Sequence, residues 1–249
     1  MDTDEARAVD MQPERDVDHG CLLDGSRGVN PLDVPAPETS GTSYKMLVER
    51  TGATDVLDDD RQIAAVARLL DVHDHHVPGY SKRLAEWAEA LARALSCSAK
   101  ELEAICRAAL LHGIGKIDVP ETTLKKSARL NDREHTMLRN QPVVAYRMLH
   151  DIAGLGAVAT LLRHRFEHWD GTGHPDGLKG DAIPVGARIL AVVEAYGEMV
   201  IGRPGAPKLY FRDAIAALRG EAGTQFDPEV AEAFCAIALE SGRDAIKQG

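Results

Sequence analysis

Histidines recur at spacings that suit a metal ion in two segments of this 249-residue sequence. His164, Glu167 and His168 fit the pattern H-x-x-E-H, in which two histidines one helical turn apart hold zinc and the glutamate acts as a base. The pattern is short and no third ligand accompanies it, so zinc-protease chemistry is a minor alternative. A second cluster, His73, His75 and His76, lies in a polar turn. The favoured interpretation of this cluster is a solvated or helix-capping role, and a relocated metal site that includes His112 is the other interpretation.

Apolar residues at helical spacing predict the elements that must position these side chains. One amphipathic helix follows Ser81, a candidate N-cap, and its apolar face is formed by Leu84, Trp87, Ala88, Leu91, Ala92 and Leu95. Capping-box spacings predict helix starts at Ser98 and Asn131. Further helices are expected after residue 58, from Pro142, and over residues 158–166, 185–200, 212–218 and 228–239. Residues 170–186 are rich in Gly and Pro and are expected to form a long ordered loop. No segment alternates like a strand, which predicts an all-α domain.

Composition supports this fold class and excludes several functions. Hydrophobic residues make up 44% of the chain and aromatic residues 4%, which favours a helical core over a β-sandwich or barrel. Residues 1–60 contain 15 acidic and 5 basic side chains and so carry the entire net charge of −10. No basic stripe exists to bind a nucleic-acid backbone. We expect a flexible acidic arm over residues 1–57, a helical domain over 58–240 and a tail over 241–249.

Localisation is predicted from what the sequence lacks. The four cysteines form no C-x-x-C pair and are expected to be reduced thiols. The N-terminus has neither the basic nor the apolar region of a secretory signal, and no apolar run approaches the ~18 residues of a membrane helix. We therefore expect a cytoplasmic protein with no membrane association.

Three segments resemble the HD-GYP family of bacterial phosphohydrolases, which open the second messenger cyclic di-GMP. They are residues 110–117 (LLHGIGKI), 167–180 (EHWDGTGHPDGLKG) and 183–192 (IPVGARILAV), and residues 222–228 (AGTQFDP) fit the C-terminal end of the family. The resemblance covers about residues 60–240. It implies an HD-domain-like helical bundle whose histidines and carboxylates hold two or three metal ions, commonly iron or manganese, for phosphodiester hydrolysis.

At most of the metal-ligand positions of the family, the resemblance implies that this sequence has lost the ligand. His112 retains the histidine of the His-Asp pair, but Gly113 has no carboxylate. Glu194 replaces a late aspartate and remains a weak ligand. The other positions, which the family fills with histidine, are occupied by Tyr80, Gln141, Arg165 and Phe166. Because each lost ligand removes charge and geometry, this pattern is typical of a degenerate site to which no metal cofactor is expected to bind.

The signature loop is retained around the altered site. It comprises Trp169, Asp170, Gly171, Gly173, His174 and Pro175, with His174 in place of the signature tyrosine. By resemblance, Lys116 and Arg203 fall at positions expected to contact substrate phosphate. Arg165 has a guanidinium at a former ligand position, and we predict that it pairs with Glu194 and closes the bundle without metal.

These features favour a catalytically degenerate HD-GYP domain that binds a nucleotide or a protein partner in bacterial signalling. A cyclic dinucleotide and a diguanylate cyclase domain are the expected kinds of partner, and a homodimer is a further one. The alternative is an active phosphohydrolase with a smaller metal site rebuilt around His112, His164, His168 and Glu194. A third option is a purely structural use of the bundle.

Overall fold

Helices joined by turns make up the described part of the chain. The structure, a computed structural model, describes residues 60–117, 119–126, 129–201 and 208–247, with side chains through residue 240, and contains no strand among them. The predicted arm, residues 1–57, lies outside the described residues. The elements are α2 (Asp60–His73), α3 (Tyr80–Ala94), α4 (Ala99–Leu110), the 3-10 helix η1 (His112–Lys116), α5 (Glu121–Leu124), α6 (Asp132–Arg139), α7 (Gln141–Leu149), α8 (Gly156–His164), the 3-10 helix η2 (Gly180–Ala182), α9 (Val185–Ile201), α10 (Phe211–Gly220) and α11 (Pro228–Lys247).

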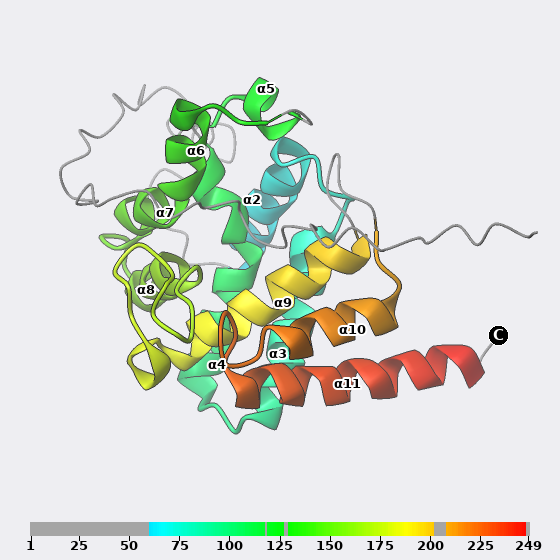
Figure 1. The fold of residues 1–249 in the computed structure, drawn as a ribbon. Helices are drawn as coiled ribbons and strands as arrows, with labels where there is room; N and C mark the ends of the chain where they lie inside the picture. The colour runs from blue at the N-terminus through cyan, green and yellow to red at the C-terminus, as the bar shows by residue number, and fades with distance from the viewer. Residues whose placement is uncertain (1–59, 118, 127–128, 202–207, 248–249) are drawn as a thin grey trace, which may run out of the picture. The chain divides into compact units, whose positions relative to one another are not determined.

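Helices α3, α4 and α9 contact one another and form the centre of this bundle. Helix α8 packs on α4 and α9, and α7 packs on α8 and η1, whereas α10 and α11 lie against another side of α9 (Figure 1). The predicted apolar face of α3 is buried, with Leu84, Ala88 and Leu91 in the core. The prediction of an all-α fold is confirmed.

The junction between α2 and α3 is held by Asp71, and not by the predicted cap. Ser81 lies inside α3, so the prediction that it is the N-cap is wrong. The N-cap is Gly79, with φ +82°, a left-handed conformation that glycine adopts without steric cost. Buried Asp71 accepts hydrogen bonds from the backbone N–H of Gly79 at 3.1 Å and of Ser81 at 3.0 Å, and from the Ser81 hydroxyl. The carboxylate therefore satisfies helix N–H groups from ten residues upstream of Ser81.

Replacing Asp71 with alanine should lower the free energy of unfolding by about 2–3 kcal/mol. The substitution leaves N–H groups at the start of α3 without an acceptor, and hydrogen bonds to charged groups are the stronger class. Urea denaturation followed by circular dichroism measures the change. Asp151→Ala, at a carboxylate that is 87% exposed, should change stability by less than about 0.5 kcal/mol. Equal losses in both variants would contradict the capping role of Asp71.

The other predicted helix starts are confirmed. Ser98 with Glu101 and Asn131 with Glu134 each form a complete capping box. Pro142 lies in the first turn of α7, where its missing N–H costs nothing. Helix α11 continues past residue 240 to Lys247, into the segment expected to be a tail. In the described part of the chain, no helix combines the length and apolar character needed to cross a membrane.

Candidate metal-binding and signature-loop site

The 3-10 helix η1 places His112 and its neighbours in the interior, directly after α4. His112, Gly113, Ile114 and Gly115 are buried, and η1 contacts α2 and α7. Lys116 ends the helix with a partly exposed side chain. The retained part of the family signature therefore lies between three helices.

The carboxylate of Asp74 lies beside Gly113, a residue that has no side chain. An ideal Cβ on Gly113 would lie 2.7 Å from Asp74 Oδ2. Asp74 is 7% exposed, and its Oδ2 lies 3.1 Å from Lys116 Nζ. Burial by itself raises a carboxyl pKa, but the Lys116 ammonium and the hydrogen bond with His73 outweigh it and hold the pKa of Asp74 well below its usual range. Asp74 is therefore an anion next to Gly113, the position at which the family resemblance implies an aspartate.

Asp74, His76 and His112 form a group in which one donor atom from each lies within 4.8 Å of the others. His112 Nδ1 lies 3.0 Å from the carbonyl oxygen of Ala109, and only a protonated Nδ1 can donate to this acceptor. His112 Nε2 and His76 Nδ1 are buried and have no hydrogen-bond partner among the described residues. Burial, and then the Lys116 ammonium, lower the pKa of both histidines, so both rings are neutral at pH 7.

Tyr80 contacts this group through its aromatic ring. Its ring stacks on His76 with centroids 4.0 Å apart and lies 5.5 Å from the ring of His112. Tyr80 is buried, and burial together with nearby acidic groups raises the pKa of its phenol far above 10. The neutral phenol therefore orients the two imidazole rings.

Arg165 is buried at the end of α8 and pairs with Glu194 of α9. Arg165 Nη1 lies 3.0 Å from Glu194 Oε1 and donates to the carbonyl oxygen of His112 at 2.5 Å. Only 1% of the Arg165 side chain is exposed, and its guanidinium lies 4.4 Å from the ring centroid of Phe166. Burial raises the pKa of Glu194, and the charge of Arg165 opposes this effect. The predicted Arg165–Glu194 pair is confirmed. Gln141, at the start of α7, is also buried.

Glu167 organises the signature loop instead of acting as a base at a zinc ion. Its Oε1 accepts the N–H of Asp176 at 2.7 Å, and its Oε2 accepts the N–H of Leu178 at 3.0 Å. One possible ligand atom from each of His164, Glu167 and Asp176 lies within 4.8 Å of the others. His168 is not part of this group, and its Nδ1 lies 3.1 Å from the Thr172 hydroxyl. The H-x-x-E-H interpretation is therefore wrong, because the two histidines do not share a site and the carboxylate is occupied by backbone donors.

The retained loop residues make contacts within the fold. The backbone N–H of Trp169 donates to the carbonyl oxygen of Gln225 at 3.1 Å. The guanidinium carbon of Arg188 lies 5.5 Å from the centroid of the Trp169 ring. Asp170 accepts the N–H of Thr172 at 2.8 Å. A Cβ on Gly173 would lie 2.1 Å from the backbone nitrogen of His168, so the loop needs glycine there. Two further backbone features shape the loop: Gly171 has φ +89°, and the His174–Pro175 peptide bond is cis.

His174 is buried against Phe166, with ring centroids 5.5 Å apart. Burial, and then the charge of Arg139, lower its pKa from 6.5 to about 4. A histidine held neutral in the folded state stabilises the protein fully above the unfolded pKa of about 6.5, and this contribution is lost as the pH falls towards 4.

Replacing His174 with tyrosine should therefore flatten the acid side of the stability profile. Between pH 7 and pH 4.5 the wild type should lose about 2 kcal/mol more unfolding free energy than His174→Tyr, because the variant has no ring nitrogen to protonate. Urea titrations across this pH range measure the difference. His174→Phe should behave in the same way, and parallel profiles for the wild type and both variants would refute the assignment.

The structure brings together some of the predicted site residues and separates others. His112, Tyr80 and Lys116 lie around Asp74, and Arg165 joins Glu194 to the backbone of η1. The rebuilt site around His112, His164, His168 and Glu194 is not assembled, because His112 and His164 belong to different groups and Glu194 is bound to Arg165. Arg203 lies outside the described residues. Sequence reasoning missed Asp74, whose only signal was its place among three histidines.

Comparisons with known proteins agree with this fold and these motifs. A family model described as an HD domain matches residues 64–230. The cyclic di-GMP phosphodiesterase response regulator RpfG of Xanthomonas campestris is 32% identical over 190 residues, which is 75% of this chain and 48% of that protein. A cyclic di-GMP phosphodiesterase of Thermotoga maritima is 31% identical over 176 residues, 69% of this chain and 47% of that protein.

Solved structures share the fold at lower identity. The cyclic GMP-AMP-specific phosphodiesterase V-cGAP3 of V. cholerae superposes with a TM-score of 0.56 at 18% identity, over 73% of this chain and 48% of that one. The HD-GYP protein Bd1817 of Bdellovibrio bacteriovorus gives 0.54 at 16% identity, over 79% and 62%. The chain therefore belongs to the HD-domain family, in its HD-GYP branch. It spans about half the length of the curated relatives it matches.

Proposed function

We propose that this chain is a non-hydrolysing HD-GYP domain that acts in cyclic-dinucleotide signalling by binding. The observation that carries the proposal is the buried guanidinium of Arg165, which pairs with Glu194; the family resemblance implies metal ligands at both positions. Fixed positive charge there opposes two closely spaced metal ions, so these residues do not fit the metal cluster of the family. Gln141 and the protonated Tyr80 also offer weaker ligands than histidine.

The partner class follows from the relatives. Curated relatives are named as phosphodiesterases of cyclic di-GMP and of 3'3'-cGAMP, which makes a cyclic dinucleotide the first ligand to test. The signature loop is the second candidate surface, for a signalling protein such as a diguanylate cyclase domain. Lys116 is the phosphate contact that the resemblance predicts. To bind a phosphate, its ammonium must first leave the ion pair with Asp74.

Hydrolysis and binding can be tested separately with the purified chain. Cyclic di-GMP and 3'3'-cGAMP are incubated with Mn²⁺ or, without oxygen, with Fe²⁺, and the products are separated by liquid chromatography. We expect no linear dinucleotide, with the Thermotoga maritima phosphodiesterase as the active control. Calorimetric titration of each nucleotide in EDTA should show binding, which Lys116→Met should weaken by about tenfold or more. Turnover would overturn the proposal, and absence of any nucleotide binding would leave only the protein-partner form of it.

One observation favours an active enzyme as the second candidate. The Asp74 carboxylate lies where the aspartate of the family pair would begin, next to His112. If this carboxylate supports hydrolysis, metal-dependent turnover will be lost in Asp74→Asn, whereas the first proposal expects no turnover in either protein.

A further inference from the structure

Possible metal-ligand atoms of three side chains converge in the interior between the α2–α3 turn and η1. They belong to Asp74, His76 and His112, and they lie within 4.8 Å of one another. His76 Nδ1 and His112 Nε2 are buried atoms without a hydrogen-bond partner among the described residues, whereas Asp74 Oδ2 has the Lys116 ammonium 3.1 Å away. A buried polar atom without a partner destabilises a fold, so two unpaired imidazole nitrogens beside a carboxylate indicate a missing ligand.

The histidines are already arranged as metal ligands are. His112 can donate its Nδ1–H to the carbonyl of Ala109, which leaves the Nε2 lone pair directed elsewhere. A metal-ligating histidine usually makes this second hydrogen bond, because it fixes the tautomer and the orientation of the ring. The ring of His76 is fixed by its stacking on Tyr80, at an interplanar angle of 14°. Both rings can therefore bind a cation without losing the contacts that orient them.

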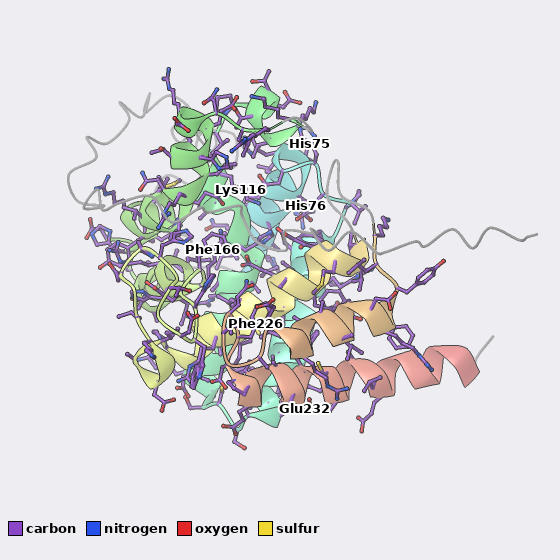
Figure 2. All side chains as sticks on the ribbon, in the orientation of Figure 1. His75, His76, Lys116, Phe166, Phe226 and Glu232 are labelled. Atoms are coloured by element: carbon purple, nitrogen blue, oxygen red, sulfur yellow. The ribbon has the colours of Figure 1, made fainter. Side chains whose placement is uncertain are left out.

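The charges around the group allow one cation and oppose two. Asp74 supplies one formal negative charge, and the carboxylate of Glu198 also acts on His76. Lys116 is the resident cation, 3.1 Å from Asp74 Oδ2, but 18% of its side chain is exposed, so its flexible stem can move towards solvent. Arg165 cannot leave in this way, because it is buried and bound to Glu194. Figure 2 shows His76 and Lys116 on the neighbouring segments that meet here.

We propose that Asp74, His76 and His112 bind a single borderline divalent cation, such as Zn²⁺, that ties the α2–α3 turn to η1. Two imidazole nitrogens and one carboxylate oxygen suit this class of ion and leave a fourth coordination position for solvent. Asp74 and His76 lie outside the ligand positions that the family resemblance implies, and the site does not use Arg165 or Glu194. The proposal therefore stands whether or not the chain hydrolyses a nucleotide.

Zinc binding to the full chain provides the test. After metal removal and dialysis against Zn²⁺, elemental analysis should find one zinc per chain. At a zinc concentration about 100-fold above the dissociation constant, the melting temperature should rise by about 5–10 °C. His76→Ala and Asp74→Asn should each weaken calorimetric zinc binding by more than about 100-fold, since loss of a ligand exceeds the 10–100-fold effect of an outer partner. Lys116→Met should tighten it, because a competing cation is removed.

His75→Asn is the matched control. His75 adjoins His76 but is outside the group, and asparagine tolerates its positive φ of +57°. This variant should bind zinc as the wild type does. Circular dichroism of each metal-free variant establishes that it is folded.

The outcomes separate this proposal from the proposed function. Stoichiometric zinc without nucleotide turnover supports both. No stoichiometric zinc, zinc retained by His76→Ala, or zinc lost by His75→Asn would overturn the cation site and leave the non-hydrolysing function in place. Metal-dependent turnover would overturn only the proposed function, provided that the one-zinc stoichiometry holds.

Discussion

Arg165→Ala is expected to lower the free energy of unfolding by about 3–5 kcal/mol, which is a large part of the stability of an ordinary domain. The substitution leaves Glu194 in the interior without its partner and removes the donor to the carbonyl of His112. The remaining carboxylate must then be ionised without compensation or take up a proton, and both cost free energy. Urea denaturation at pH 7, followed by circular dichroism, measures the loss.

Two variants separate the buried charge from the general effect of losing an arginine. Arg163 lies two positions earlier on α8 and pairs with the more exposed Asp176 at 2.6 Å, so Arg163→Ala should cost about 1 kcal/mol or less. In the double variant Arg165→Met/Glu194→Met, apolar side chains replace both charges and should recover most of the stability. If Arg165→Ala were no more harmful than Arg163→Ala, the pair would not hold α8 to α9.

Restoring the aspartate of the family pair is the second change with a large expected effect. Gly113→Asp should destabilise the protein by about 3 kcal/mol or more, because its Cβ would lie 2.7 Å from Asp74 Oδ2 and a second carboxylate would enter the same buried space. The measurement is thermal and urea unfolding in EDTA, so that no metal can compensate the added charge.

Two further variants divide this effect into its parts. Gly113→Ala adds the steric contact alone and should cost about 1–2 kcal/mol. Gly113→Asp/Asp74→Ala should be more stable than Gly113→Asp, since the new carboxylate can then pair with Lys116. Additive losses in the double variant would mean that Asp74 does not occupy the space beside Gly113.

Local sequence signals predicted the helices well, because the interactions that start them are local. The capping boxes at Ser98 and Asn131 join residues three apart, and apolar spacing located the buried face of α3. The start of α3 was predicted wrongly because its acceptor, Asp71, lies on the preceding helix, outside any capping window. The short helix α5 has too few residues for a periodic pattern and was not predicted.

The candidate site was predictable only where one residue replaced another at a known position. The family resemblance implies a histidine at Arg165 and an aspartate at Glu194, so the sequence has complementary charges at two positions close together in the expected fold, and the structure pairs them. The carboxylate of Asp74 beside Gly113 was missed, because it joins segments far apart in the chain and only the packing of α2 on η1 brings them together. The spacing of residues along the sequence does not reveal that Asp74 and Gly113 lie close together.

The Arg165–Glu194 pair also means that α8 and α9 are joined by two side chains of the chain itself. The guanidinium of Arg165 is covalently part of the chain, so, unlike a bound metal ion, it cannot be chelated or exchanged for a competing ion. The contact that this pair makes between α8 and α9 therefore forms without any metal ion.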